Sequence, residues 1–254
     1  MSALYLDLAL EAPQNGATLI LAGSEAKHAG TVNRLRVGEE ILIANGRGLL
    51  ISARVSAVQK DELSYLVESV EQQAETTPKV YLVQSLAKGG RDELAIQAAT
   101  ELGIAGIIPW QADRSIVRWD AQKQEKNIAR WETIVQEAAK QSKNLWIPEV
   151  LPVLNSKEMM RELPAKRCII LEPRAAKRLS TLVQELSPSL SAAGSQNTEP
   201  IYLLVGPEGG ISQSELNHFE EAGAQHARMG ELVLRSSTAG PAALAVINSA
   251  LGRW

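Results

Sequence analysis

The sequence predicts an α/β protein with a small β-domain at its amino end. From about residue 80 onward, short apolar runs alternate with segments of helical periodicity, which is typical of a mostly parallel sheet covered on both faces. Before residue 72, short strands are separated by turns, as in a small barrel or sandwich. The 254 residues suffice for one large domain or two smaller ones. We expect domains at residues 1–72 and 78–254.

The amino-terminal segment alternates apolar and polar residues, as half-buried strands do. Strands are expected at Thr18–Leu21, Glu40–Ala44, Leu49–Val58 and Leu63–Val70. Asn45 and Gly46 follow the second of these strands and indicate a hairpin turn, because both residue types tolerate positive φ. The polar segment Glu71–Pro78 ends in proline and is the expected linker.

The second domain is expected to alternate strands and helices. Its predicted strands are Val80–Leu86, Ile104–Trp110, Cys168–Leu171, Ile201–Val205 and Gln225–Met229. Its predicted helices are Asp92–Leu102, Gln122–Lys143, Glu215–Ala222 and Ala239–Leu251. The first two helices carry a clear apolar face. Ser187–Pro200 is rich in small and polar residues and poor in large apolar ones, so we expect a mobile surface loop there.

Composition and charge exclude several classes of protein. The formal net charge of −3 argues against a generally basic, nonspecific nucleic-acid binder, although bases outnumber acids between Lys27 and Lys60. No apolar run is long enough to cross a bilayer, and no signal peptide is expected. Cys168 is the only cysteine; we expect a buried strand residue and a cytoplasmic protein. The three histidines are far apart, so no metal site is predicted.

The most informative stretch is Leu203–Ser212. An apolar run ends in Gly-Pro-Glu-Gly-Gly at residues 206–210, and Ser212 then opens a helical pattern. Glu215 follows Ser212 by three residues, which predicts a capping box. Loops at the carboxyl ends of strands in α/β sheets bind ligands, and adjacent glycines let the backbone approach a ligand closely. The segment therefore predicts a ligand-binding loop.

A second segment has the same order of features. Residues 229–239 read Met-Gly-Glu-Leu-Val-Leu-Arg-Ser-Ser-Thr-Ala, which is a glycine, a short apolar run and polar residues that open the last helix. One such loop is common and mostly structural, whereas two in one α/β domain predict a shared pocket. Neither segment has the Lys-Ser/Thr of a Walker loop, and Gly-x-Gly-x-x-Gly is absent.

Together, residues 206–210 and 234–239 resemble the two carboxy-terminal motifs of the RsmE family, the 16S ribosomal RNA uridine-N3 methyltransferases of the SPOUT class. Further segments that match the family are His28–Gly38, Lys88–Arg91, Thr100–Gly103, Asp113–Ser115 and Glu137–Ser142. The resemblance implies a trefoil-knotted α/β domain that binds S-adenosylmethionine and a PUA-like β-barrel domain. It also implies a homodimer that acts on 16S ribosomal RNA of the small ribosomal subunit, with the helix at 122–143 and the final helix as candidates for the dimer interface.

The resemblance also implies roles for individual residues. Cofactor contacts are expected from Leu171, Glu172, Val205, Gly206, Pro207, Glu208, Gly209, Met229, Gly230, Leu232, Leu234, Thr238 and Ala239. Arg235 is the first candidate for catalysis, because a guanidinium can stabilise charge on a uracil carbonyl, and Glu101 is the second. RNA contacts are expected from Arg34, Arg36, Lys88, Arg91, Arg114 and Lys143.

The chain departs from the family pattern at two positions. Ser237 stands where the family has an acidic residue, and a hydroxyl cannot replace a carboxylate as a base. Asn144 stands where the family has arginine, and Lys143 beside it can supply the charge. Two alternatives therefore stay open. One is a SPOUT methyltransferase with another RNA target, and the other is a noncatalytic RNA-binding or assembly factor of the same fold.

Overall fold

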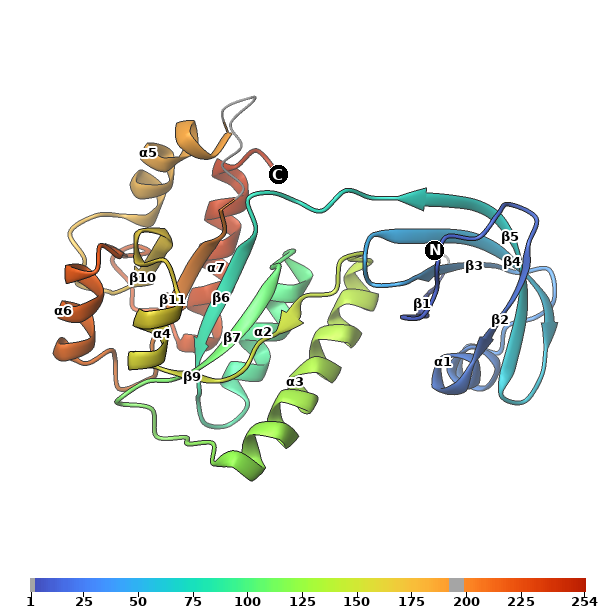
Figure 1. The fold of residues 1–254 in the computed structure, drawn as a ribbon, viewed down its shortest axis with the longest axis horizontal. Coiled ribbons are helices and arrows are strands. Elements are labelled where there is room, and N and C mark those ends of the chain that lie inside the picture. The colour runs from blue at the N-terminus through green and yellow to red at the C-terminus, as the bar shows by residue number, and fades with distance from the viewer. Residues whose placement is uncertain (1–2, 192–198) are drawn as a thin grey trace. The chain divides into compact units, whose positions relative to one another are not determined.

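The computed structural model describes residues 3–191 and 199–254, and its chain divides into two compact units (Figure 1). The first unit comprises Met1–Glu75 and Ala139–Ile147, and the second comprises Thr76–Ala138 and Pro148–Trp254. Each unit has its own sheet and its own apolar core. The helix that ends at Ser142 contributes its last turn to the first unit.

The first unit is built on a curled sheet with the strand order β1-β3-β4-β5-β2 (Figure 1). Its strands are β1 Leu4–Leu6, β2 Thr18–Ala22, β3 Glu40–Ala44, β4 Leu49–Val58 and β5 Glu62–Gln72. β1 pairs with β3 in parallel, and the other pairs are antiparallel. The four predicted strands are confirmed. β1 was not predicted, because three consecutive apolar residues are too short to show a period.

The predicted hairpin turn joins β3 to β4. Asn45 holds the turn with its side chain, since Oδ1 accepts hydrogen bonds from the backbone nitrogens of Arg47 at 2.8 Å and Leu49 at 3.2 Å. Gly46 and Gly48 both have positive φ, and a Cβ on Gly48 would lie 2.5 Å from the Gln73 carbonyl oxygen. Sequence chemistry and close packing thus fix the same turn.

Two short helical segments of the first unit were not predicted. α1 spans Gly23–Lys27, and a π-helix follows at His28–Val32. Each is five residues long, so neither shows a helical repeat in the sequence. Glu25 of α1 forms an ion pair of 2.7 Å with the buried Lys140, which fastens the segment 139–147 to this unit.

The second unit contains a fully parallel sheet with the strand order β12-β10-β11-β6-β7-β8, and β9 also pairs with β7. Its strands are β6 Val80–Ser85, β7 Gly106–Gln111, β8 Glu149–Val150, β9 Leu154–Asn155, β10 Cys168–Leu171, β11 Ile201–Val205 and β12 Gln225–Ala227. The central strands are buried on both faces, as near-continuous apolar runs predict. The five predicted strands are confirmed within a few residues, although β12 ends two residues early.

Helices pack on both faces of this sheet (Figure 1). They are α2 Arg91–Glu101, α3 Ala121–Ser142, α4 Ser156–Glu162, α5 Leu179–Ser191, α6 Gln213–Glu221 and α7 Ser236–Ala250, with a 3₁₀ turn at Ala165–Arg167. α7 packs closely on one face, where a Cβ on Gly240 would lie 2.9 Å from Leu82. Met159 of α4 and Phe219 of α6 belong to the core on the other face.

The prediction of a loop at Ser187–Pro200 is wrong in its first part, because α5 continues to Ser191. Residues 192–198 of that predicted loop lie outside the described residues. α5 had a helical signal that the serine-rich composition obscured, since Leu179, Leu182 and Val183 are buried at helical spacing. Within the described ranges, the structure contains no helix both long and apolar enough to span a membrane.

Candidate functional site

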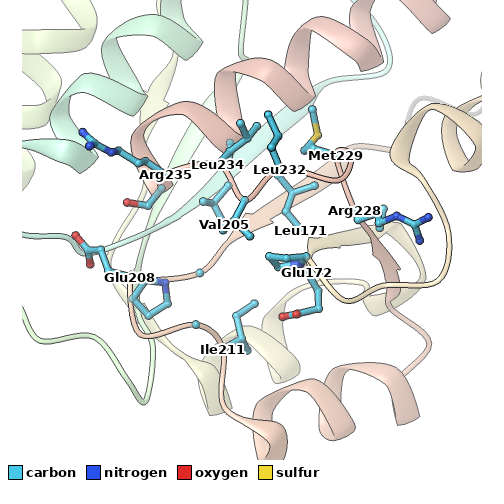
Figure 2. Close-up of a pocket in the computed structure, with 18 of the residues that line it drawn as sticks. Leu171, Glu172, Val205, Glu208, Ile211, Arg228, Met229, Leu232, Leu234 and Arg235 are labelled. Atoms are coloured by element: carbon cyan, nitrogen blue, oxygen red, sulfur yellow. The ribbon is translucent and has the colours of Figure 1, made fainter.

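A cavity of about 370 Å³ lies at the carboxyl ends of β10, β11 and β12 (Figure 2). These strands are neighbours in a parallel sheet, with Leu171 paired to both Val205 and Ala227. The segments that follow them therefore converge, although they are far apart in sequence. The two glycine-containing loops that predicted a shared pocket line this one cavity.

The centre of the cavity is apolar. Leu171, Val205, Leu232 and Leu234 surround the same space in Figure 2. Val205 is buried, whereas Leu232 is 82% exposed. The cavity is therefore closed by core residues on the sheet side and bordered by an exposed apolar side chain at its rim. Such a space suits a flat apolar ligand group with one face open for further contacts.

Polar groups surround this apolar centre. Glu208 forms an ion pair of 2.9 Å with Arg91 at the start of α2. Ser236 opens α7 on the cavity wall, and its buried hydroxyl oxygen has no hydrogen-bond partner among the described residues. Buried hydroxyls are ordinarily paired, so the Ser236 hydroxyl is an available contact for a ligand.

The loop after β11 needs glycine for its shape. A Cβ on Gly206 would lie 2.5 Å from the side chain of Ile211. The Gly210 nitrogen donates to the Pro207 carbonyl oxygen at 2.8 Å, and Gly210 has a φ of +72°. The chain therefore turns sharply between Val205 and α6, and this turn places residues 206–208 on the cavity wall.

The predicted capping box at the start of α6 is confirmed. The Ser212 hydroxyl accepts from the Glu215 nitrogen at 3.1 Å, and the Glu215 carboxylate accepts from the Ser212 nitrogen at 2.8 Å. The Glu215 carboxylate is buried and also accepts from the Asp113 nitrogen at 2.8 Å and from the Ser156 hydroxyl. One carboxylate thus connects the loop after β11 with the loop after β7 and the start of α4.

A second brace holds the loop after β10. Arg228 lines the cavity with part of its side chain, and its guanidinium donates to the carbonyl oxygens of Ala175 at 2.7 Å and Ala176 at 2.6 Å. In Figure 2 this guanidinium points away from the apolar centre. Arg228 therefore fixes one wall of the cavity and presents no charge at its centre.

Eleven of the thirteen expected cofactor residues line the cavity. They are Leu171, Glu172, Val205, Gly206, Pro207, Glu208, Met229, Gly230, Leu232, Leu234 and Ala239. Two do not line it. Gly209 faces Arg114 on the other side of the loop, where a Cβ would lie 3.4 Å from the Arg114 Cβ. Thr238 is exposed on the first turn of α7.

The two expected catalytic residues are placed differently. Arg235 lines the cavity, but Figure 2 shows its side chain extending away from the apolar centre. Glu101 lies at the end of α2, is exposed, and accepts a hydrogen bond of 3.1 Å from Gln97. It is not part of the cavity wall.

Several lining residues were not predicted as cofactor contacts. They are Arg91, Pro173, Gly210, Ile211, Ala227, Arg228, Val233 and Ser236. Pro173 and Arg228 follow the ends of β10 and β12, so the tendency of ligands to bind at strand ends could have indicated both. Arg91 had been assigned to RNA, and its contact with Glu208 joins residues 117 positions apart, which no local pattern indicates.

The residues expected to contact RNA are distributed over both units. Arg34, Arg36 and Lys143 belong to the first unit, and Arg34 and Lys143 have positive φ. Lys88, Arg91 and Arg114 belong to the second unit. Arg36 and Lys88 are exposed, as phosphate contacts require.

Neither a reactive cysteine nor a cluster of metal-binding side chains is found among the described residues. Cys168 is buried in β10 as expected, and burial raises the pKa of its thiol to about 12, so the thiolate is not populated near neutral pH. Across residues 3–191 and 199–254, no three His, Cys, Asp or Glu side chains are grouped so that they could hold a metal ion.

Comparison with known families assigns both parts of the chain. The RNA methyltransferase domain family matches residues 74–248, and the RNA methyltransferase PUA domain family matches residues 21–65. The first match covers more than half of the chain and contains the whole cavity described above.

Curated relatives and solved structures agree with these matches. The chain is 34% identical over 242 residues to the ribosomal RNA small subunit methyltransferase E of Mycobacterium bovis, covering 95% of this chain and 90% of the relative. It is 29% identical to the protein of that name from Bacillus subtilis, covering 98% and 96%. The crystal structure of the Neisseria gonorrhoeae ribosomal RNA small subunit methyltransferase E, bound to S-adenosylmethionine, superposes with a TM-score of 0.84 at 28% identity, covering 98% of each chain.

Proposed function

The chain belongs to the ribosomal RNA small subunit methyltransferase E family, and from this premise we propose that it transfers a methyl group from S-adenosylmethionine to N3 of a uridine in 16S ribosomal RNA. The single observation that carries the proposal is the cavity at the ends of β10, β11 and β12. The two motifs, at 206–210 and 229–239, form much of its wall together with the end of β10. The apolar centre of this cavity and the charged side chains at its edge suit an adenosine with a charged tail.

The residues present fit this cofactor. A cavity of about 370 Å³ lies within the range of small-molecule sites. Leu171, Val205 and Leu234 provide apolar walls for an adenine ring, and the unpaired hydroxyl of Ser236 offers a hydrogen bond. When bound, S-adenosylmethionine supplies an electrophilic methyl group on a sulfonium. The protein therefore needs to position the uracil and to ease the loss of its N3 proton.

Charged residues at the cavity are suited to positioning the substrate and to easing the loss of the N3 proton. Arg91 and Glu208 form an ion pair at the edge, where each can exchange its partner for a charged group of the cofactor or of the RNA. Arg235 makes no hydrogen bond or ion pair through its guanidinium within the described ranges, so it is free to contact a uracil carbonyl. Positive charge there would stabilise the deprotonated base before methyl transfer.

The family also supports coarser features of the molecule. We propose that the chain has the trefoil knot of the SPOUT class in residues 78–254 and a PUA-like RNA-binding domain in residues 1–72. A homodimer in the cytoplasm, acting on the small ribosomal subunit, completes the proposal. The exposed side chains of Leu232 and Val233 support a subunit contact close to the cavity.

The test is a methylation assay on the purified protein. The protein is incubated with S-adenosylmethionine carrying an isotope-labelled methyl group and with small-subunit RNA, and nucleosides are identified by mass spectrometry. Labelled 3-methyluridine is the expected product. A different labelled nucleoside would identify another RNA target. Cofactor binding by calorimetry without transfer to any ribosomal substrate would contradict the enzymatic proposal and favour an assembly factor.

A further inference from the structure

A second cavity of about 520 Å³ adjoins the one described above. The two cavities share part of their walls, namely Glu172, Pro173, Gly210, Ile211 and Val233. Gly210 and Ile211 line both, so a ligand in the second cavity would lie close to one in the first. Its other walls come from the loop after β7, which holds the expected RNA contact Arg114, from the loop after β10, from α6 and from β12.

The second cavity carries positive charge on its border. Arg114 and Arg174 both line it and are both exposed. Arg114 donates one hydrogen bond of 3.2 Å to the Gly209 carbonyl oxygen, which leaves other guanidinium donors available. Two arginines that line one cavity provide guanidinium donors of the kind that bind phosphate.

Arg174 is the unpaired cation of a basic loop. The loop from Glu172 to Arg178 joins β10 to α5 and contains three bases. Lys177 forms an ion pair of 2.6 Å with Glu185, and Arg178 forms one of 3.2 Å with Glu231. In the part of the chain that the structure describes, the Arg174 guanidinium has no such partner. An external anion is the partner that its position favours.

A buried nitrogen offers a specific contact inside the cavity. His226 of β12 lines the wall, and its Nε2 atom is buried without a hydrogen-bond partner in the described ranges. An unpaired buried ring nitrogen costs free energy, and a polar ligand can remove that cost. Leu216 of α6 lines the same space and offers an apolar surface against which a base can pack. The cavity thus combines cations at its border with polar and apolar groups inside.

We propose that this second cavity binds a nucleotide of the RNA strand that carries the methylated base. Arg114 and Arg174 contact its phosphate, and His226 hydrogen-bonds its base. RNA recognition commonly uses single-stranded nucleotides whose unstacked bases enter protein pockets, and the cavity has room for one. The shared wall at 210–211 then holds the strand beside the cofactor. This inference rests on the proposed function and specifies how the substrate is held.

The experiment separates RNA binding from cofactor binding. The full chain is prepared with Arg174→Gln, His226→Phe or His226→Gln, and with Arg161→Gln as the matched control. Arg161 is an exposed arginine of α4 that pairs with Glu162 and lines neither cavity. Affinity for a small-subunit ribosomal RNA transcript is measured over a range of salt concentrations, affinity for S-adenosylmethionine by calorimetry, and folding by thermal melting.

The variants are expected to weaken RNA binding alone. Arg174→Gln should lower RNA affinity about 10-fold and reduce the slope of log affinity against log salt by about 0.7, as the loss of one phosphate contact requires. His226→Phe should lower RNA affinity several-fold, and His226→Gln, which keeps a hydrogen-bonding nitrogen, should restore part of that affinity. Affinity for the cofactor and the melting temperature should match those of Arg161→Gln.

Three results would overturn the inference. RNA affinity equal to that of the control in every variant would show that the cavity does not bind the strand. Parallel loss of cofactor affinity would show that these residues act by shaping the first cavity. An unaltered protein that binds the cofactor but no small-subunit RNA would contradict the proposed function as well. The unaltered protein therefore tests the proposed function, and the variants test the nucleotide site in the second cavity.

Discussion

At the scale of single residues, Ser236 carries the clearest physical signal in the cofactor cavity. Its side chain is 7% exposed, its hydroxyl is unpaired among the described residues, and it opens the helix that closes the cavity. An unpaired buried hydroxyl contributes little to the stability of the ligand-free protein. Its position is therefore better explained by a ligand contact than by folding.

Ser236→Ala is expected to lower S-adenosylmethionine affinity about 3- to 10-fold, the effect of one hydrogen bond. The melting temperature of the ligand-free protein should not fall, because no existing hydrogen bond is lost. Calorimetry and thermal melting measure the two quantities. Ser85→Ala is the control, since Ser85 is equally buried and unpaired but lines neither cavity. Equal cofactor affinity in both variants would show that Ser236 makes no ligand contact.

The sequence predicted which loops form the cavity better than it predicted which residues of those loops face it. Eleven predicted residues line the cavity wall, nine from the two motifs and two, Leu171 and Glu172, from the end of β10, because strand ends in a parallel sheet converge. Gly209 and Thr238 belong to the same motifs but face elsewhere. The direction of one loop residue depends on φ and ψ values that the motif does not encode. Ser236 was missed for a related reason, since the lack of a partner for a hydroxyl is visible only after folding.

At the scale of elements, the Glu215 carboxylate joins three parts of the second unit. It caps α6, accepts from the Asp113 nitrogen after β7, and accepts from Ser156 at the start of α4. Ser156 in turn accepts from the Trp110 indole nitrogen at 3.1 Å. The loop at 206–211 lies between β11 and α6, so its conformation depends on this network. Glu215 is a positioning residue for the cavity.

Glu215→Gln should reduce the free energy of unfolding by about 2 kcal/mol, since the amide group cannot accept with both ends and introduces unpaired donors in a buried place. Cofactor affinity should fall in the same variant. The matched control is Glu158→Gln at the capping box of α4, where the carboxylate is half-buried and caps only its own helix. That control should lose only about 0.3–1 kcal/mol, because glutamine can keep the capping box and only the negative charge at the helix N-terminus is lost. Denaturant unfolding compares them, and equal losses would refute a special role for Glu215.

Helices and strands long enough to repeat their apolar pattern several times were predicted from the sequence, whereas elements of a few residues were not. α2, α3 and the central strands match their predicted ranges closely, because several turns or pleats repeat in each. β8 and β9 have two residues each, and α4 has seven. Their positions depend on pairing with β7 and on packing against α6. Such tertiary contacts leave no periodic trace in the sequence.

At the scale of the whole molecule, the proposed dimer can be tested at the rim of the cavity. Leu232 and Val233 are 82% and 76% exposed and are adjacent, and adjoining exposed apolar side chains are typical of a surface that contacts another protein. Sedimentation should show a species of about twice the chain mass of 27.5 kDa. Leu232→Ser combined with Val233→Ser should shift it toward the single chain. A single-chain species in the unaltered protein would contradict the dimer, and a dimer that resists the double change would place its interface elsewhere.

The overall charge of −3 means that RNA affinity must arise from local groups. Arg34 and Arg36 lie in an exposed segment after the π-helix, and neighbouring Val32 and Val37 are 65% and 66% exposed. Neither guanidinium has an ion pair within residues 3–191 and 199–254. This segment of the first unit is therefore a candidate RNA contact that is separate in sequence from the cofactor motifs.

Replacing Arg34 and Arg36 with glutamine together should lower affinity for small-subunit RNA about 10-fold and reduce the salt slope by about 1.4, the value for two lost phosphate contacts. Cofactor affinity should not change. Arg54→Gln is the control, because Arg54 lies in the same unit but is held by Glu68 at 2.7 Å and Glu40 at 3.0 Å. Those two carboxylates raise the pKa of Arg54 and occupy its guanidinium. If Arg54→Gln reduced the salt slope as much as the double variant, RNA contact would follow general positive charge, and the assignment to Arg34 and Arg36 would be wrong.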